Sequence, residues 1–242
     1  MSGSTKEETM RIYQSTVEMI REVERDLFEM GVRYQSATVQ DQQVGRDPRF
    51  MTIELTGYAY TLTGYDDADR AVLYMQNSLD WARAEASERL VGEVVPPNPG
   101  SAWREDRGRW EKFVRDGAFS YSYAERWQYQ LPYIIRELRN RPSTRQAVMT
   151  MYDVHQDMMN WGGRDRVPCS LSYQFVIRDG VLTLVYNQRS CDFVKFFSTD
   201  VYITCELLKH MARETKTLPG RLIHFLGSLH AFAGDLEGKK IF

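Results

Sequence analysis

Cys169 and a polar segment that follows it form the strongest chemical pattern in this sequence. Cys169 comes directly after Pro168, and the run QRSCD occupies residues 188–192. The thiolate is the attacking form of cysteine, and a nearby arginine favours it. An arginine beside a serine also offers a charged fork and a hydroxyl that suit a phosphate. A single cysteine near strands is more often a small core residue, but this pairing predicts that Cys169 is a nucleophile and that Arg189 and Ser190 hold an anionic group.

The composition limits the partners of this chemistry. The chain has 242 residues, of which 43% are hydrophobic and 26% charged, so we expect one globular domain over residues 1–242. The formal net charge of -2 gives no general attraction to nucleic acid or to an anionic membrane, so any phosphate must be held locally. Three cysteines without a CxxC pair predict neither a disulfide framework nor a zinc site, and they favour a reducing, cytoplasmic location. We find no leader-like segment, no apolar run long enough for a membrane span and no histidine spacing that predicts a metal site.

The elements that must position these residues are predicted from the spacing of apolar side chains. Helical spacing occurs over residues 6–30, 66–90, 122–138 and 201–213, and alternating or continuous apolar runs predict strands over 51–60, 171–177, 181–187 and 222–226. Asp179-Gly180 predicts a hairpin between the second and third of these strands. The polar stretch 36–50 and the proline-rich stretch 95–102 predict loops.

Five segments, in order along the chain, resemble the thymidylate synthase family. PCSLSYQF at 168–175 and NQRSCD at 187–192 resemble the family's nucleophile strand and phosphate-binding strand. YSYAER at 121–126, RPSTRQ at 141–146 and GSLHAF at 227–232 resemble its tyrosine segment, its phosphate-binding turn and its sugar-binding segment. The resemblance implies an α/β (α+β) domain with three layers and a large mixed β-sheet. It also implies a symmetric homodimer in which each subunit lends an arginine to the other's site.

The resemblance further implies a covalent mechanism. The Cys169 thiolate adds to ring carbon 6 of a pyrimidine nucleoside monophosphate, and carbon 5 then accepts a one-carbon unit from 5,10-methylenetetrahydrofolate, which splits a hard step into easier ones. The other implied site residues are Tyr123 for catalysis, Trp103 and Asp192 for the folate, and for the substrate Arg46, Arg49, Gln188, Arg189, Ser190, His230 and, from the partner subunit, Arg145. From the residues alone, a surface role for Arg46 and Arg145 stays open. So do a packing role for Trp103 and a structural role for His230.

Asp200 departs from the family in a way that has chemical meaning. Counting from Asp192 places Asp200 where thymidylate synthases have an asparagine that reads uracil. A single amide matches the N3 hydrogen and the O4 acceptor of uracil, whereas cytosine reverses both groups. A protonated carboxyl matches cytosine, because it accepts from the amino group and donates to N3. Asp200 therefore predicts cytidylate, as in the T-even phage deoxycytidylate hydroxymethylases, which this chain also resembles, and Asp200→Asn is expected to shift preference toward uridylate.

Other departures concern the reaction itself. The stretch YMQNSLDW at 74–81 places Ser78 where the family has a catalytic glutamate, and Asp80 lies two positions further on. The C-terminal EGKKIF does not match the closing tail of methylating members, which favours 5-hydroxymethylation by addition of water. A missing carboxylate at Ser78 favours 5-methylation. Three further family residues, a histidine, a phosphate-binding arginine and a sugar-binding tyrosine, are replaced by Ser170, Gln146 and Phe232.

These patterns predict a dCMP 5-hydroxymethyltransferase. The alternatives are a dCMP 5-methyltransferase, a thymidylate synthase that acts on dUMP, and a homologue that binds nucleotide without catalysis. Ser78, Ser170 and Gln146 together motivate the last alternative, and the retained Cys169 argues against it. Phe232 leaves the choice of ribose or deoxyribose open, and the sequence does not distinguish a phage from a cellular origin.

Overall fold

A large mixed β-sheet forms the centre of this protein. The computed structural model describes residues 10–36, 38–39, 42–43, 45–90, 96–105, 107–161 and 165–237. The strand order is β1-β5-β10-β8-β7-β6, with β2 on β5 and β9 on β10; β1 is parallel to β5, and β8 and β9 are parallel to β10. The strands are β1 Arg11–Tyr13, β2 Val32–Gln35, β5 Met51–Leu62, β6 Val148–Thr150, β7 Ser170–Arg178, β8 Val181–Gln188, β9 Cys191–Asp192 and β10 Leu218–Phe232. The mixed sheet that the resemblance implied is therefore confirmed.

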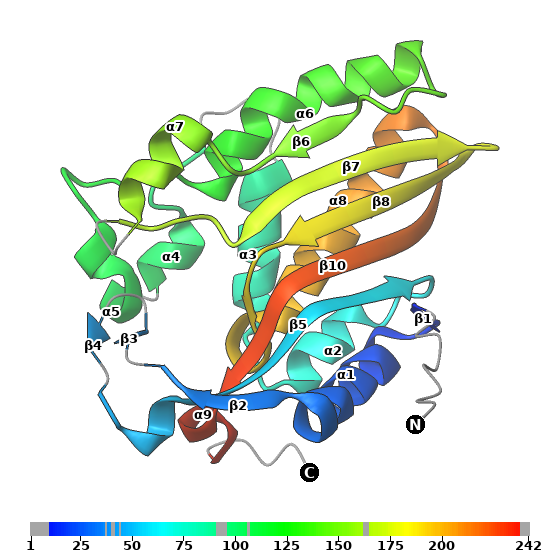
Figure 1. Ribbon diagram of the computed structural model, residues 1–242. Coiled ribbons are helices and arrows are strands. Elements are labelled where there is room, and N and C mark those ends of the chain that lie inside the picture. Colours follow the sequence, from blue (N-terminus) through cyan, green and yellow to red (C-terminus); the bar gives the residue numbers. More distant parts are fainter. Residues whose placement is uncertain are drawn as a thin grey trace.

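Helices cover one face of this sheet (Figure 1). The helices behind the sheet in this view are α1 Thr16–Met30, α2 Ala68–Tyr74, α3 Leu79–Leu90 and α8 Ser198–Thr215, and α6 Tyr123–Asn140 runs along the edge strand β6. The shorter elements are α4 Ser101–Glu105, α5 Arg107–Trp110, α7 Val154–Asp157, α9 Ala233–Glu237, the 3-10 turns η1 Pro48–Phe50, η2 Glu111–Phe113 and η3 Met158–Asn160, and the π-helix η4 Phe193–Phe197. In the part of the chain that the structure describes, the front of β5, β10, β8 and β7 carries no helix.

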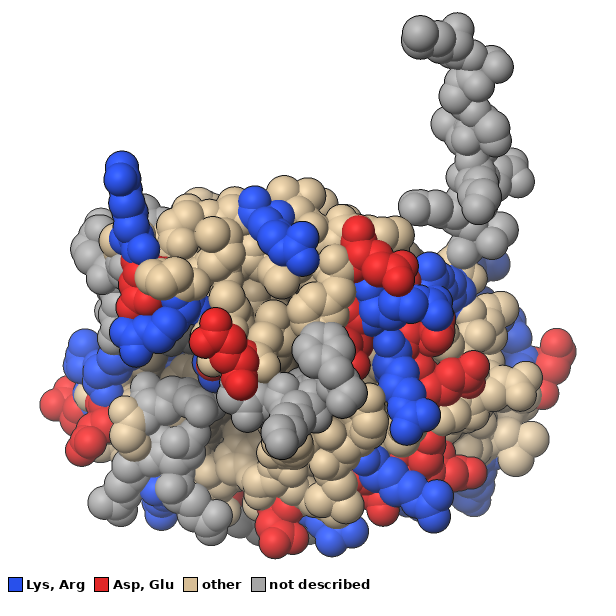
Figure 2. Space-filling model, turned by 90° about the horizontal axis from the view of Figure 1, so that it is seen from below, with Lys and Arg blue, Asp and Glu red and all other residues tan. Residues whose placement is uncertain are grey.

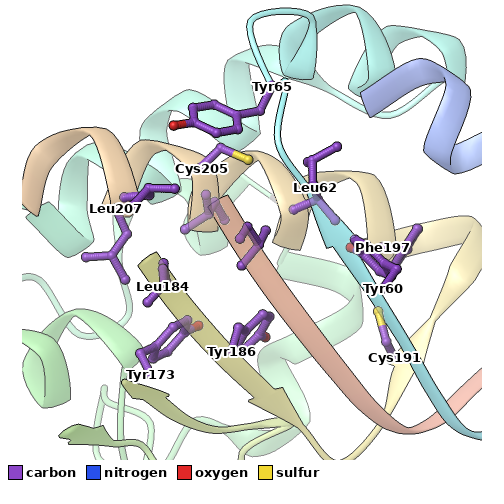
Figure 3. Packing of buried hydrophobic residues seen from close by; sticks show 14 of the residues in the cluster. Tyr60, Leu62, Tyr65, Tyr173, Leu184, Tyr186, Cys191, Phe197, Cys205 and Leu207 are labelled. Atoms are coloured by element: carbon purple, nitrogen blue, oxygen red, sulfur yellow. The ribbon is translucent and has the colours of Figure 1, made fainter. Parts of the chain in front are cut away.

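The core lies between the sheet and these helices. Along β10 the side chains of Leu222, His224 and Leu226 are buried, whereas the intervening Phe225 is 43% exposed. This alternation follows from strand geometry, in which successive side chains point to opposite faces. Figure 3 shows side chains of β5, β8 and α8 that meet in this buried layer. The sheet therefore has one buried face and one open face.

The N-terminal helix is shorter than the predicted range 6–30. Residues 11–13 form β1, which pairs with β5, and α1 begins only at Thr16. Ser15 caps this helix, because its hydroxyl accepts a hydrogen bond from the N–H of Glu18 at 3.1 Å. The helical spacing of apolar residues included β1, and only its long-range pairing with β5 makes this segment a strand.

The range 66–90, predicted as one helix, is two helices. Gln76 has a φ of 54° and separates α2 from α3. This left-handed conformation does not continue a right-handed helix. The other two predicted helices are confirmed as α6 and α8.

The predicted strands are all present. Asp179 and Gly180, with φ of 51° and 74°, form the predicted hairpin turn between β7 and β8. The predicted strand 222–226 is the middle of the much longer β10, which pairs with β5 on one side and with β8 and β9 on the other. The predicted loop 36–50 contains a short separate ribbon of β3 Thr38–Val39 and β4 Gln42–Gln43.

Acidic and basic side chains are interspersed on the face seen from below (Figure 2). This mixture agrees with the small net charge of the sequence. Among the described helices, none is long and apolar enough to cross a membrane.

Candidate active site

A large cavity of about 730 Å³ contains most of the predicted site. Its lining includes eight residues predicted from the sequence: Trp103, Tyr123, Cys169, Arg189, Ser190, Asp192, Asp200 and His230. These residues come from α4, α6, α8, β9, β10 and the segments that flank β7 and β8. The fold therefore brings into one cavity the predicted nucleophile, the predicted phosphate-binding residues, the predicted base-reading residue and the predicted folate contacts.

Backbone hydrogen bonds hold Cys169 at the entrance of β7. Its N–H donates to the Tyr123 hydroxyl oxygen at 2.8 Å, and the N–H of Ser170 lies 3.3 Å from the same oxygen. Tyr123 begins α6 directly after Ser122, which closes a capping box with Glu125. The Tyr123 hydroxyl thus positions the backbone of Cys169.

Arg189 connects Cys169 to the end of the neighbouring strand β8. Its backbone N–H donates to the Cys169 carbonyl at 2.8 Å, and its Nη2 lies 3.8 Å from the Cys169 sulfur. Its Nε donates to the Pro168 carbonyl at 2.7 Å, and its Nη2 donates to the Val167 carbonyl at 3.0 Å. Arg189 therefore orders the segment before Cys169, and its guanidinium is also open to solvent.

Burial raises the pKa of the Cys169 thiol, and the guanidinium of Arg189 is the main group that lowers it. Arg166 also lowers this pKa, whereas Asp200 and Asp192 raise it. Arg189 therefore lowers the pKa of Cys169, as the sequence predicted, but the loss of hydration on burial raises this pKa by more. Burial therefore favours the neutral thiol over the thiolate.

Asp200 lies in the first turn of α8 and faces the cavity that contains Cys169. Its Oδ2 accepts a hydrogen bond from Gln188 Nε2 at 2.7 Å and lies 3.6 Å from the Cys191 sulfur. Burial raises the pKa of Asp200, and Arg89 is the first of the groups that oppose this. Gln188 was predicted as a substrate contact, but it is buried behind Asp200 and does not line the cavity.

Ser78 does not lie in the cavity. Its side chain is exposed, and its hydroxyl accepts a hydrogen bond from the N–H of Trp81 at 3.1 Å, at the start of α3. Asp80 is exposed as well and is likewise absent from the cavity lining. The structure does not support the predicted catalytic position at Ser78, because the turn at Gln76 makes this segment the beginning of a separate helix.

Glu85 and Arg89 are charged residues near the cavity that sequence reasoning missed. Arg89 lines the cavity, is only 4% exposed and donates from Nε and Nη2 to Glu85 Oε1 at 2.9 and 2.7 Å. Its guanidinium carbon lies 4.4 Å from the centre of the Tyr123 ring. Glu85 Oε2 is buried and has no hydrogen-bond partner among the described residues. The spacing of one helical turn was visible in the sequence, but the burial of the pair depends on tertiary packing.

An aromatic cluster forms another wall of the cavity. The Trp103 ring packs edge-on at 4.5 Å from Trp110 and 6.4 Å from Phe119. The guanidinium of Arg166, a residue that sequence reasoning also missed, lies 5.4, 5.1 and 4.5 Å from the centres of these three rings. Trp103 therefore has a packing role and also lines the cavity. Aromatic walls with a nearby cation suit a flat ligand that carries negative charge.

Asp192 and His230 are register partners on β9 and β10. The Asp192 carboxylate accepts hydrogen bonds from the N–H groups of Val194 and Lys195, each at 3.0 Å, and so caps η4. Burial raises the pKa of Asp192 and lowers that of His230, and the two groups partly offset this burial effect in each other. His230 packs edge-on against Phe232, which also lines the cavity.

Three predicted phosphate-binding arginines lie outside this cavity. Arg46 is exposed after β4, and Arg49 is paired with Asp47 at 2.6 Å. Arg145 is exposed in the turn between α6 and β6, and the neighbouring Gln146 lines a smaller, separate cavity. Of the predicted phosphate contacts, Arg189 and Ser190 therefore line the cavity.

Residues 238–242 of the C-terminal segment lie outside the described residues, so the structure does not test the argument from the closing tail. Within the described ranges, no group of three or more histidine, cysteine or carboxylate side chains is arranged to bind a metal ion.

Comparisons with known proteins agree with this geometry. A family described as thymidylate synthase matches residues 75–240, a range that leaves out Arg46 and Arg49. A protein of Methanosarcina barkeri named "Putative thymidylate synthase" is 29% identical over 148 residues, which are 57% of this chain and 66% of that protein. The thymidylate synthase of Rhizorhabdus wittichii is 24% identical over 124 residues, which are 51% of this chain and 39% of that protein. The matches thus span less than two thirds of these relatives. The solved structure of thermostable thymidylate synthase A from Bacillus subtilis has a TM-score of 0.69 and 14% identity, with 92% of this chain and 82% of that chain covered, which shows a shared fold.

Proposed function

The chain belongs to the thymidylate synthase family, and we propose that it transfers a one-carbon unit from 5,10-methylenetetrahydrofolate to carbon 5 of dCMP, as a 5-hydroxymethyltransferase. This family uses 5,10-methylenetetrahydrofolate as its one-carbon source. The observation that carries the choice of base is that the half-buried Asp200 and the proposed nucleophile Cys169 line the same cavity.

Cys169 begins the proposed reaction. Its sulfur forms a bond to ring carbon 6, and the electron pair of the bond between carbons 5 and 6 makes carbon 5 nucleophilic. Arg189 lies 3.8 Å from the sulfur and favours its ionised form, while Tyr123 holds the backbone N–H of Cys169. Carbon 5 bonds to the one-carbon unit and loses its hydrogen as a proton, and the bond between that unit and the folate nitrogen breaks with its electron pair on the nitrogen. Water then adds its oxygen to the methylene carbon and gives up a proton. The carbon–sulfur bond breaks last, because its electron pair returns to the sulfur as the double bond between carbons 5 and 6 forms again, which frees the product.

The cavity walls fit the two ligands. Arg189 and Ser190 suit the phosphate of the nucleotide. Trp103 and Asp192 give an aromatic surface and a hydrogen-bonding group for the ring system of the folate, which supplies the one-carbon unit when it is bound. The cavity volume of about 730 Å³ is within the usual range for small-molecule sites.

Asp200 supports cytosine as the base. Burial raises the pKa of this carboxyl and so favours its neutral form. A neutral carboxyl donates to N3 of cytosine with one oxygen and accepts from the amino group with the other. The uracil of dUMP would leave unmatched polar groups in the same orientation, each costing about 1 to 3 kcal/mol.

Glu85 supports the proposal that this protein is catalytic over the alternative that it binds nucleotide without catalysis. The sequence comparison with Ser78 suggested that the chain lacks the family's carboxylate. Glu85 is a buried carboxyl on the same helix, it is bound to the cavity residue Arg89, and its charge influences Asp200. We assign to Glu85 the carboxylate role in the proton transfers that follow the one-carbon transfer.

The open face of the sheet supports the proposed homodimer. Phe225 is exposed in the middle of β10, and Val185 on the adjacent β8 is half-buried. A second sheet would cover this face and bury its apolar side chains. Arg145 is exposed and lies outside the cavity of its own subunit, as expected of a residue that contributes to the site of the partner.

Mass spectrometry of the product tests this proposal. The protein is incubated with dCMP and 5,10-methylenetetrahydrofolate, and the mass of the nucleotide is measured. Addition of CH2O is expected; addition of CH2 would identify the 5-methyltransferase instead. Turnover of dUMP in preference to dCMP would contradict the assignment of the base. Failure to release tritium from 5-tritiated dCMP or dUMP would favour the alternative of nucleotide binding without catalysis.

A further inference from the structure

A chain of buried hydrogen bonds leads from Asp200 into the core. Gln188 Nε2 donates to Asp200 Oδ2 at 2.7 Å, and Gln188 Oε1 lies 3.1 Å from His224 Nε2. His224 Nδ1 lies 2.9 Å from the hydroxyl oxygen of Tyr60. His224 and Tyr60 are both fully buried and do not line the cavity. Figure 3 shows the Tyr60 side chain on β5 within the core layer.

The chemistry of these groups fixes the direction of each hydrogen bond. Burial lowers the pKa of His224 to about 3, so the ring is neutral and has one donor and one acceptor nitrogen. With the amide of Gln188 oriented toward Asp200, its carbonyl oxygen only accepts, so His224 Nε2 carries the hydrogen. His224 Nδ1 is then the acceptor, and the Tyr60 hydroxyl donates to it. All donors in this chain point toward Asp200.

The opposite direction is unfavourable. It requires the Gln188 amide to flip, the proton of Asp200 to sit on Oδ2, and His224 Nδ1 to donate to the Tyr60 oxygen. The hydroxyl hydrogen of Tyr60 would then be buried without an acceptor among the contacts that the described residues show. An unsatisfied buried donor is costly, so the direction toward Asp200 is favoured.

We propose that Tyr60 and His224 are positioning residues that fix the polarity with which Asp200 reads the base: Oδ2 only accepts, and the carboxyl proton is confined to Oδ1. Asp200 lines the cavity, and Oδ1 has no hydrogen-bond partner within the described ranges, so it is free for a ligand. The Cys191 thiol, 3.6 Å from Oδ2, adds a second weak donor to the oxygen that already accepts from Gln188.

The fixed polarity has a consequence for specificity. A free carboxylic acid carries its proton on either oxygen, so it matches cytosine in one form and uracil in the other. The chain through His224 removes this ambiguity and leaves one form. If the proposed function is right, on which this specificity rests, Oδ1 donates to N3 of cytosine and Oδ2 accepts from the amino group.

A double variant tests this role in the full chain. Tyr60→Phe combined with His224→Phe removes the hydrogen bonds beyond Gln188 without leaving an unpaired Tyr60 hydroxyl. It also keeps an aromatic ring beside Tyr186, which stacks on His224 at 4.4 Å. Tritium release from 5-tritiated dCMP and dUMP gives kcat/KM for each base. We expect the ratio of dCMP to dUMP to fall about tenfold, the equivalent of one fixed hydrogen bond, mainly because the use of dUMP rises. An unchanged ratio in the active double variant would overturn the proposal.

Tyr65→Phe is the matched control, because it removes another buried tyrosine hydroxyl, which donates to the Gly220 carbonyl at 3.2 Å. This control should leave the ratio of the two bases unchanged. A purely structural role for Tyr60 and His224 would lower kcat/KM for both bases together and keep their ratio, which also counts against the proposal.

Nitrogen-15 NMR of the unsubstituted protein tests the direction of the chain separately. The sequence has only four histidines, so the His224 signal can be assigned by substitution. A neutral ring with its hydrogen on Nε2 is expected, and a hydrogen on Nδ1 would overturn the proposal even if the double variant does not fold. Lack of a preference for dCMP in the unsubstituted protein would instead contradict the proposed function, whatever the tautomer of His224.

Discussion

Replacement of Asp200 by asparagine separates two interpretations of the base site. From the sequence alone, Asp200→Asn should move preference from cytidylate to uridylate, because an amide matches uracil. The hydrogen-bond chain predicts a weaker effect. Gln188 Nε2 donates at 2.7 Å to the position of Oδ2, so the oxygen of the introduced amide would be held there and its NH2 group would take the position of Oδ1. This order of acceptor and donor is the same as in the neutral acid, and it still matches cytosine.

The structure also gives the size of the effect. To read uracil, the new amide must turn over and place its NH2 group against the NH2 group of Gln188. This arrangement loses the hydrogen bond to Gln188 and leaves a buried donor unpaired, at a cost of about 1 to 3 kcal/mol. The cost corresponds to roughly a fivefold to 150-fold loss of uridylate turnover. Asp200→Asn alone should therefore change the ratio of kcat/KM for dCMP to kcat/KM for dUMP only a little. The change should be larger when Asp200→Asn is combined with Tyr60→Phe and His224→Phe, because the Gln188 amide can then flip.

Tritium release with each nucleotide measures this difference. The four proteins to compare are the unsubstituted protein, Asp200→Asn, the double variant Tyr60→Phe/His224→Phe and the combined triple variant. We expect only the triple variant to prefer dUMP. If Asp200→Asn alone reversed the preference as fully as the triple variant, the hydrogen-bond chain would have no part in reading the base, and the reasoning from its direction would be refuted.

Three further predictions concern catalysis and stability. Cys169→Ala should abolish tritium release and the covalent complex with 5-fluoro-dCMP and methylenetetrahydrofolate, and retention of either would contradict the nucleophile assignment. Glu85→Gln should lower kcat by about a hundredfold or more, as expected for loss of a group in proton transfer. Ser78→Ala should lower only the free energy of unfolding, by about 1 kcal/mol, because it removes the hydrogen bond at the start of α3. A large loss of kcat in Ser78→Ala and none in Glu85→Gln would contradict this assignment. Burial raises the pKa of Glu24 from 4.5 to about 7, so at pH 8 the native protein carries a buried charge, and Glu24→Gln should raise the free energy of unfolding by about 1 to 3 kcal/mol. Because the native pKa is the higher one, this gain should disappear as the pH falls from 7 to below 4.5, and urea unfolding that shows the same gain at both ends would contradict the assignment.

Local motifs predicted the parts of the site that lie on one strand or turn. The segments around Cys169 and Arg189 are the two strands of a hairpin, and the spacing of that hairpin is fixed by the turn at Asp179 and Gly180. Their meeting therefore depends on local geometry that the sequence contains. Asp200 lies in the first turn of α8, a helix that was predicted only from residue 201 onward, so its position next to that helix was within reach of the same reasoning.

Residues whose roles depend on helix packing were not predictable in this way. Ser78 was assigned by counting within a short similar stretch, but Gln76 has a left-handed conformation that begins a new helix and turns Ser78 outward. Arg89 is buried where α3 packs against α6 and α8, and the Tyr123 ring of α6 lies against its guanidinium. The sequence pattern gave His224 no role in the site, and its partners Gln188 and Tyr60 lie on different strands. Long-range strand pairing decides such contacts, and one sequence does not reveal it.

The cavity resolves an apparent conflict between the charge of the chain and its proposed substrate. The chain has a net charge of -2, yet a nucleoside monophosphate is itself an anion. Burial raises the pKa of Asp192, of Asp200 and of the Cys169 thiol, so the site favours the neutral form of its own acidic groups. The side chains of Arg166 and Arg189 line the same cavity, and both lower the pKa of Cys169. The same burial therefore reduces the negative charge that opposes a phosphate in the cavity, and it favours the neutral carboxyl of Asp200 that the proposed contact with N3 of cytosine requires.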